Sequence, residues 1–164
     1  MERYNLRIGY IYVTDKPCII STILGSCVSV CIYDIATGLS GMNHYLLSKS
    51  GNQERSTRYG DISIHKMYKI FMDSGSKISN LRAYVIGGTS FLSNNSIFSI
   101  SQDNVDVAIN LLNMFQIKVL QQNTGGKVGR KVEFNTVTNK VEVIVLDAIE
   151  SSRLQVDEAE EWKK

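Results

Sequence analysis

One cysteine of this chain lies in a setting that suits a nucleophile. Cys27 follows Gly25 and Ser26 in the run ILGSCVSV, which predicts a tight turn that leads into a strand. A thiol at such a turn can be exposed, and backbone N–H groups of the turn can point at a developing oxyanion. Free cysteine is also among the most buried residue types, so a structural thiol is the alternative hypothesis. Cys27 is therefore a candidate nucleophile, with Gly25 and Ser26 as candidate oxyanion positions.

His44, in the run GMNHYLLS, is the candidate base for this thiol. The chain has two histidines, so few Cys–His pairs can form. His44 follows Cys27 by 17 residues with one turn between them, and two neighbouring antiparallel strands would bring the side chains together. A histidine that is hydrogen-bonded within the sheet is an equally good interpretation of this residue alone. His65 lies beside Lys66 and Lys69 on a predicted helix, and we expect it to be solvated.

The remaining cysteines and glycines are not expected to form a metal or phosphate site. Cys31 follows Cys27 by four residues, about 13 Å on an extended strand, which is too far for both thiols to bind one metal ion. The run NTGGKVGRK lacks the Gly-Lys-Ser/Thr that ends a phosphate-binding loop. We therefore expect no metal and no cofactor. Special backbone positions, in turns or in the wall of a substrate cleft, are expected at Gly87, Gly88, Gly125 and Gly126.

The composition is that of an ordinary globular domain. The chain has 164 residues, of which 43% are hydrophobic and 21% charged, and its formal net charge is +2. This length fits one domain, and the charge is too small to indicate a nucleic-acid partner. No apolar run reaches the roughly 18 residues of a spanning helix, and we expect neither a signal peptide nor membrane insertion. Three cysteines clustered early in the chain favour free thiols and a cytoplasmic protein.

Short runs of alternating side chains predict a domain rich in β-strands. Strands are expected at residues 4–13, 19–24, 28–33, 38–47, 83–86, 117–121, 131–135 and 140–146. The strands of the first third follow one another without helices between them, which argues against a doubly wound parallel sheet. Residues 48–60 are polar and rich in Gly, Ser and Arg, which predicts a mobile loop.

Two amphipathic helices are expected between the later strands. Asp61 caps the first, which ends before Gly75 and has an apolar stripe of Ile64, Met67, Tyr68, Phe71 and Met72. The second spans roughly 103–115. We expect a layered α/β (α+β) sandwich of mixed or antiparallel sheet, with a single catalytic domain over 1–147. Residues 148–164 are charged and are expected to form a loose helix or a disordered tail.

Five runs occur in a fixed order along most of the chain: LGSCVSVCIYD, GMNHYLL, RYGD, VIGG and NTGGKVGRKVEF. Together they resemble the CheD family of chemoreceptor glutamine deamidases. The resemblance implies a cytoplasmic hydrolase of bacterial or archaeal chemotaxis, which converts glutamines on the cytoplasmic helices of chemoreceptors to glutamates and releases ammonia. It also implies a fold shared with deamidating toxins and binding to a CheC-type phosphatase. We expect a monomer when the protein is alone.

The resemblance also implies roles for individual residues. Cys27 would be the nucleophile, His44 the general base, and a hydroxyl six residues before the cysteine would complete the site. That position is Ser21, where the family usually has threonine, and a slip of one residue would place Thr22 there instead. The family also favours Ile-Gly-x-Arg-Asn before the second long helix, where residues 100–104 read ISQDN.

These departures leave two other hypotheses open. The changes at Ser21 and at 101–103 motivate a protein that acts mainly by binding a CheC-type phosphatase, with weak or no deamidase activity. Cysteine–histidine sites cleave esters as well as amides, so a receptor glutamyl methylesterase is the other alternative.

Overall fold

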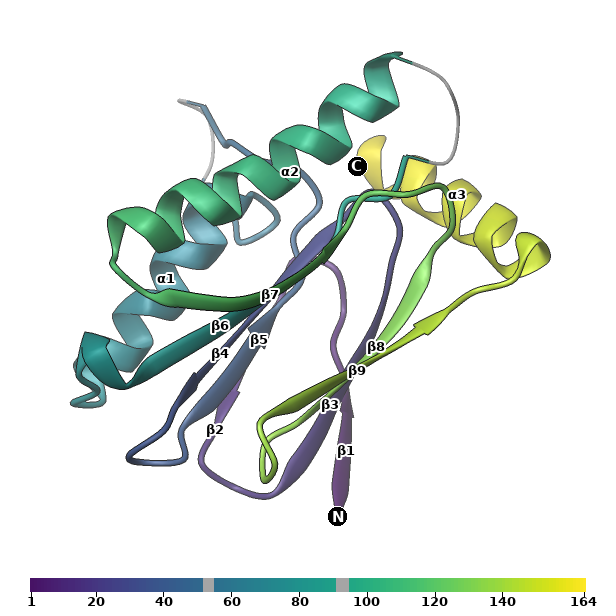
Figure 1. The fold of residues 1–164 in the computed structure, drawn as a ribbon. Coiled ribbons are helices and arrows are strands. Elements are labelled where there is room, and N and C mark those ends of the chain that lie inside the picture. Colours follow the sequence, from purple (N-terminus) through teal and green to yellow (C-terminus); the bar gives the residue numbers. More distant parts are fainter. Residues whose placement is uncertain (52–54, 91–94) are drawn as a thin grey trace.

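Among the described residues, two β-sheets and three α-helices form the layers, and a short 3-10 helix spans Ile78–Asn80 (Figure 1). This computed structural model describes residues 1–51, 55–90 and 95–164. The two sheets pack face to face, and helices α1 (Gly60–Asp73) and α2 (Asn95–Met114) cover the outer face of the larger sheet. The predicted fold class, a layered α+β sandwich, is confirmed.

The smaller sheet has the strand order β1-β3-β8-β9. Its first two strands are parallel, and the other neighbours are antiparallel. The strands are β1 (Glu2–Asn5), β3 (Cys18–Leu24), β8 (Arg130–Asn135) and β9 (Lys140–Val145). Alternate residues of β3 and β8 face the other sheet because side chains of a strand alternate between its two faces. These residues contribute Ile20, Leu24, Val132 and Phe134 to the core between the sheets.

The larger sheet has the order β2-β5-β4-β6-β7 and is antiparallel except for its last pair. The strands are β2 (Ile11–Thr14), β5 (Ser40–Asn43), β4 (Val28–Asp34), β6 (Leu81–Gly87) and β7 (Lys118–Thr124). Every residue of the central strand β4 is buried. Val28, Val30 and Ile32 pack under the helices, whereas Cys31 and Tyr33 face the smaller sheet. The strand is therefore covered on both faces, and the pairing confirms that the sheet is not doubly wound.

Helix α1 uses the apolar stripe predicted for it. Ile64, Met67 and Phe71 are fully buried, and Tyr68 and Met72 pack beside them. Helix α2 begins at residue 95, well before the predicted start near residue 103. Of the loop predicted at 48–60, residues 52–54 lie outside the described part of the chain.

The prediction of one strand over 4–13 is wrong. This segment forms β1 and β2, which belong to different sheets. Gly9 has a φ of +88° in the connection, and Tyr10 N–H donates to the Arg7 carbonyl at 3.2 Å. A positive φ is readily adopted by glycine and turns the chain from one sheet to the other.

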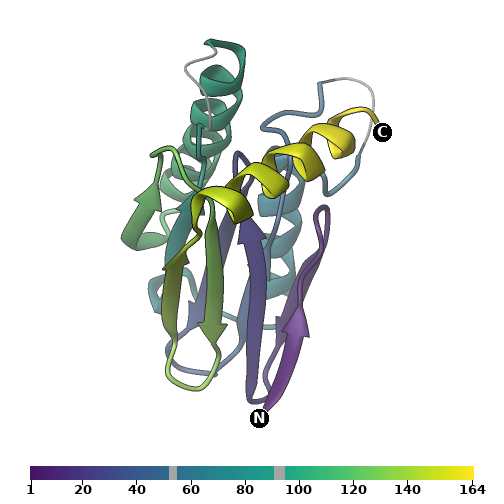
Figure 2. The same ribbon diagram turned by 90° about the vertical axis from the view of Figure 1, so that its right-hand side faces the viewer.

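Residues predicted as a loose helix or disordered tail form the regular helix α3 (Ala148–Trp162). Asp147 caps it by accepting from Glu150 N–H at 2.8 Å, and the Glu150 side chain accepts from Asp147 N–H at 3.3 Å. This reciprocal pair satisfies two backbone donors at the start of the helix. Helix α3 crosses the end of the two sheets, where β3 runs into β4 (Figure 2).

Candidate active site

Strand pairing places Cys27 and His44 on the same face of the larger sheet. Val28 and Tyr45 form an isolated antiparallel bridge that continues the register of β4 and β5. This register sets Cys27 opposite Leu46, so His44 is the diagonal neighbour of Cys27 on the adjacent segment. Diagonal neighbours on one face are about 7–8 Å apart or less, which an imidazole ring can span. The two antiparallel segments therefore place both residues on one face, but His44 Nε2 makes no hydrogen bond to the Cys27 sulfur in this structure, so their pairing stays a prediction.

The His44 ring is buried and held at one nitrogen. Its Nδ1 lies 2.7 Å from Thr22 Oγ1, and Thr22 Oγ1 donates to the Leu6 carbonyl at 2.8 Å. The threonine hydroxyl has one hydrogen, which the carbonyl takes, so His44 Nδ1–H must be the donor to Thr22. The other nitrogen, Nε2, then carries a free lone pair. It is buried and has no hydrogen-bond partner among the described residues.

The protonation state of His44 suits a base. Burial lowers the pKa of His44 from 6.5 to about 3, because the apolar surroundings disfavour the imidazolium. The ring is therefore neutral near pH 7, and Nε2 can accept a proton. A proton taken from a nearby thiol would place a positive charge on a ring that Thr22 already orients.

The structure corrects the expected third position from Ser21 to Thr22. Ser21 Oγ donates to Asn5 Oδ1 at 2.7 Å, and His44 contacts Thr22 instead. Counting six residues back from Cys27 gives Ser21, but a shift of one residue along a strand moves the side chain to the opposite face. Thr22 is the hydroxyl on the face of β3 that meets the larger sheet.

The Cys27 thiol is fully buried, which favours its protonated form. Burial raises its pKa well above the ordinary value, and the carboxylate of Glu158 raises it further. Cys18, Cys27 and Cys31 are all free, as predicted. Because the thiolate is the attacking species, reaction at Cys27 needs a base and a change in the position of Glu158.

The turn before Cys27 binds a carboxylate. Gly25 N–H donates to Glu158 Oε2 and Ser26 N–H donates to Glu158 Oε1, each at 2.8 Å. Ser26 Oγ adds a hydrogen bond of 2.5 Å to Oε1. The turn predicted as an oxyanion position therefore holds an anion in place. The sequence interpretation missed Glu158, which lies in the segment expected to be a tail; the Asp147–Glu150 capping pattern was the signal for an ordered helix there.

Asn104 joins the turn to the segment that carries His44. Its side-chain Nδ2 donates to the Ser26 carbonyl at 3.0 Å and to the Leu46 carbonyl at 2.9 Å. Asn104 lies inside α2, so residues 100–104 are not the loop before a helix that the sequence suggested. The residue is fully buried, and its two contacts fix the spacing between the turn and the strand segment.

The two Gly-Gly pairs lie next to the turn and hold its backbone: one pair bonds to Cys27 and the other bonds to the first pair. Gly88 N–H donates to the Cys27 carbonyl at 2.9 Å, and Gly125 N–H donates to the Gly87 carbonyl at 3.0 Å. Gly87 has a φ of +118°, and a Cβ there would lie 2.2 Å from the Cys27 carbonyl oxygen. Neither pair, including Gly126, lines the large groove beside His44. In the described residues these glycines contact the turn that carries Cys27, and their place in the wall of a substrate cleft stays a prediction.

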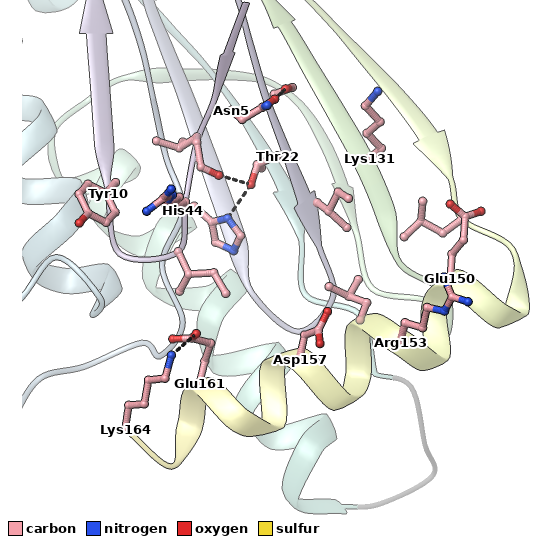
Figure 3. A pocket seen from close by; sticks show the side chains of 17 residues that line it. Asn5, Tyr10, Thr22, His44, Lys131, Glu150, Arg153, Asp157, Glu161 and Lys164 are labelled. Carbon is pink, nitrogen blue, oxygen red and sulfur yellow. Dashed lines mark hydrogen bonds and ion pairs between the residues drawn. The ribbon is translucent and has the colours of Figure 1, made fainter.

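A groove of about 900 Å³ opens beside His44 (Figure 3). It runs between β3 and α3, with His44 and Thr22 in its wall. Its charged lining residues are Arg7, Lys131, Glu150, Arg153, Asp157, Glu161 and Lys164.

Within the described ranges, no cluster of three or more His, Cys, Asp or Glu residues could hold a metal ion. His65 is exposed on α1, as predicted.

Comparison with known proteins identifies the family. The family model described as CheD chemotactic sensory transduction matches residues 46–144. The chain belongs to the CheD family. A CheD relative from Trichlorobacter lovleyi, named a probable chemoreceptor glutamine deamidase, is 35% identical over 143 residues, or 86% of this chain and 89% of the relative. A relative from Rhodospirillum rubrum with the same name is 37% identical over 142 residues, or 86% and 81% of the two chains.

A solved structure shares the fold of this CheD chain. The Bacillus licheniformis hypothetical protein YfiH matches with a TM-score of 0.50 and 15% identity, over 71% of this chain and 51% of YfiH. At this identity the match supports the layered fold alone. In the part of the chain that the structure describes, no helix has the length and apolar character needed to cross a membrane.

Proposed function

We propose that this CheD-family protein hydrolyses glutamine side chains on the cytoplasmic helices of chemoreceptors to glutamates, with Cys27 as nucleophile and His44 as base. The observation that carries the proposal is the free lone pair of His44 Nε2, buried one diagonal from Cys27 while Thr22 holds the opposite nitrogen. The names of the relatives, probable chemoreceptor glutamine deamidases, supply the substrate class.

The first half of the reaction forms a thioester. Cys27 transfers its proton to His44 Nε2, and the sulfur attacks the carbonyl carbon of the glutamine side chain. The carbonyl electron pair moves to oxygen, where N–H groups of the turn stabilise the charge. One such donor contributes roughly 3–4 kcal/mol to transition-state stabilisation. Imidazolium then returns its proton to nitrogen, and ammonia leaves.

The second half restores the enzyme. Neutral His44 takes a proton from water, and the hydroxide attacks the thioester carbonyl. The carbon–sulfur bond breaks, the sulfur recovers a proton from His44, and a glutamate side chain is released. Thr22 keeps the ring in one tautomer and orientation throughout, which is the usual role of the third member of such a site.

Mass spectrometry of receptor cytoplasmic fragments tests the proposal directly. Incubation with the protein should add about 1 Da at each converted glutamine, with release of one ammonia, and Cys27→Ala should abolish both. Cys31→Ala is the matched control, because Cys31 is also a fully buried free thiol that faces the smaller sheet. Conversion that survives Cys27→Ala would overturn the covalent mechanism.

The position of Glu158 favours a second candidate function. With Cys27 buried beside this carboxylate, the chain could act mainly by binding a CheC-type phosphatase. Such a protein would bind its partner without releasing ammonia. The same Cys–His site could hydrolyse glutamyl methyl esters, in which case methanol would be released instead. Measuring ammonia and methanol in parallel separates the three activities.

A further inference from the structure

Glu158 has surroundings unlike those of the rest of α3. Only Ser151 and Glu158 are buried in this 15-residue helix, and Glu158 is 1% exposed. Its carboxylate accepts three hydrogen bonds from Gly25 and Ser26, and it also interacts with the Cys27 thiol. A helix from the far end of the chain therefore delivers one acidic side chain to the candidate nucleophile.

The chemical identity of that side chain is informative. Hydrolysis of a glutamine side chain gives a glutamate side chain, and in a cysteine hydrolase the product carboxylate lies against the oxyanion donors and the sulfur. Glu158 has this arrangement, with both carboxylate oxygens on N–H groups of the turn. It is also presented from the surface of an α-helix. The chain thus holds in its own site the side chain that deamidation of a helical glutamine would produce.

We propose that α3 occupies the substrate site as an internal product analogue, and that a substrate helix bearing a glutamine displaces it to reach Cys27. The proposal rests on the proposed deamidase function. It adds that α3 must be displaced before substrate binds, and that the substrate glutamine is presented on a helix. The accepted substrate is a glutamine on an exposed helical face, because the site already binds a side chain that an α-helix presents. With α3 in place the site is closed, since Cys27 is 0% exposed.

Besides Glu158, a hydrogen bond from Gly129 N–H to Ser151 Oγ at 3.0 Å and the packing of Trp162 against the core between the sheets hold α3 in place. Burial raises the pKa of Glu158 despite its hydrogen bonds, so the ionised carboxylate is not at an optimum in this position. Near the C-terminus of α3, Arg58 donates to the Glu161 carbonyl at 2.7 Å. Ile149 and Val156 remain 68% and 62% exposed on the outer side. A partner helix that supplies more apolar contact and a neutral glutamine can therefore compete with α3.

The first experiment measures access to Cys27 in the full-length chain. Glu158→Ala should raise the rate of Cys27 alkylation by iodoacetamide near pH 7 by about tenfold or more, because one unit of thiol pKa corresponds to tenfold in thiolate. It should also raise the rate of deamidation of receptor fragments. Glu160→Ala, an exposed carboxylate on the same helix, is the matched control and should change neither rate.

The second experiment makes α3 its own substrate. In Glu158→Gln the side-chain amide lies where the carboxylate did, so Cys27 should hydrolyse the introduced amide and restore glutamate, with a gain of about 1 Da in the intact chain. The double variant Cys27→Ala/Glu158→Gln should keep its amide. The native Gln155 of α3 and a Glu160→Gln variant should stay unconverted, because neither side chain is at the turn.

The outcomes separate this proposal from the proposed function. Alkylation and receptor deamidation that are unchanged in Glu158→Ala, together with an amide that persists in Glu158→Gln, would overturn the internal occupant while leaving the deamidase intact. Faster alkylation of Cys27 without ammonia release from any variant would overturn the deamidase and keep α3 as the cover of the thiol. If Glu158→Ala unfolds, the test rests on Glu158→Gln alone. Circular dichroism should then show that Glu158→Gln has the same fold as the wild type.

Discussion

The turn at Gly25–Cys27 is held on two sides by groups of different chemistry. On the inner side, neutral donors from Asn104, Gly88 and Thr89 bind the three backbone carbonyls of the turn at 2.7–3.0 Å. On the outer side, one carboxylate, that of Glu158, binds its N–H groups. The inner contacts come from elements within the core, whereas the outer contact comes from a helix that is mostly exposed.

The two sets of contacts have different roles: the inner hydrogen bonds must stay in place during the reaction, whereas the Glu158 carboxylate must leave the turn. The inner contacts set the direction of the Cys27 backbone, and their loss would move the nucleophile relative to His44. The outer contact occupies the N–H groups that the reaction itself would use, so catalysis by this site requires Glu158 to leave them. Hydrogen bonds between neutral groups suit the inner contacts, which are permanent. A single buried carboxylate suits the outer contact, which a substrate can displace.

The largest predicted effect concerns the inner side at Gly87. Gly87→Ala would force a Cβ to 2.2 Å from the Cys27 carbonyl oxygen at a φ of +118°, so the turn must shift. We expect a loss of about 3 kcal/mol or more in the free energy of unfolding, measured in urea. Gly125→Ala is the control: its φ is +80° with open space around it, and only about 1 kcal/mol should be lost. Equal losses would show that the close approach at Cys27 is unimportant.

The next prediction concerns His44, whose response to pH should differ in sign from that of Glu158 on the outer side of the turn. Burial lowers the pKa of His44 from 6.5 to about 3, so between these values the unfolded chain binds a proton that the folded chain does not. The free energy of unfolding should therefore fall as the pH falls through this window, by up to about 1.4 kcal/mol per pH unit from His44. Urea unfolding across this window measures the slope, and His44→Gln should flatten it.

Glu158 should act with the opposite sign. Its pKa is raised from 4.5, so the folded chain keeps this proton at pH values where the unfolded chain has lost it, and stability declines as the pH rises above 4.5. The double variant Cys27→Ala/Glu158→Gln, which keeps its amide, should lack that decline when compared with Cys27→Ala alone, and it should keep the acid slope of His44. A His44→Gln curve parallel to that of the wild type would refute the assignment of the acid slope.

Local pattern predicted much of the fold. The alternation of side chains located the strands of both sheets, and the stripe from Ile64 to Met72 located α1. The division of 4–13 into two strands depends on the φ of Gly9, a single backbone angle that side-chain alternation does not report. The capping pattern of Asp147 and Glu150 marks the start of α3 locally, whereas its docking against the turn at Gly25 and Ser26 depends on contacts across the chain that local pattern does not show.

The candidate site was predictable only where it is local. Cys27 and His44 follow from one turn and two adjacent antiparallel segments, so their spacing in sequence was informative. Thr22 lies on a strand of the other sheet, and its facing depends on a register that counting residues could not fix. Glu158 is more than 130 positions from the turn it binds, and nothing in its own neighbourhood marks it as part of a site.

The smallest predicted effect tests whether Thr22, rather than Ser21, is the residue of β3 that orients His44. Thr22→Val keeps the shape of the side chain but removes the hydroxyl that orients His44, so kcat for receptor deamidation should fall about tenfold or more with little change in KM. The loss in the free energy of unfolding should be about 1–2 kcal/mol, since the buried His44 Nδ1–H and Leu6 carbonyl lose their partner. Ser21→Ala is the control on the opposite face, where only the bond to Asn5 is lost and kcat should hold. A larger kcat effect at Ser21 than at Thr22 would return the third position to the residue that counting back from Cys27 selects.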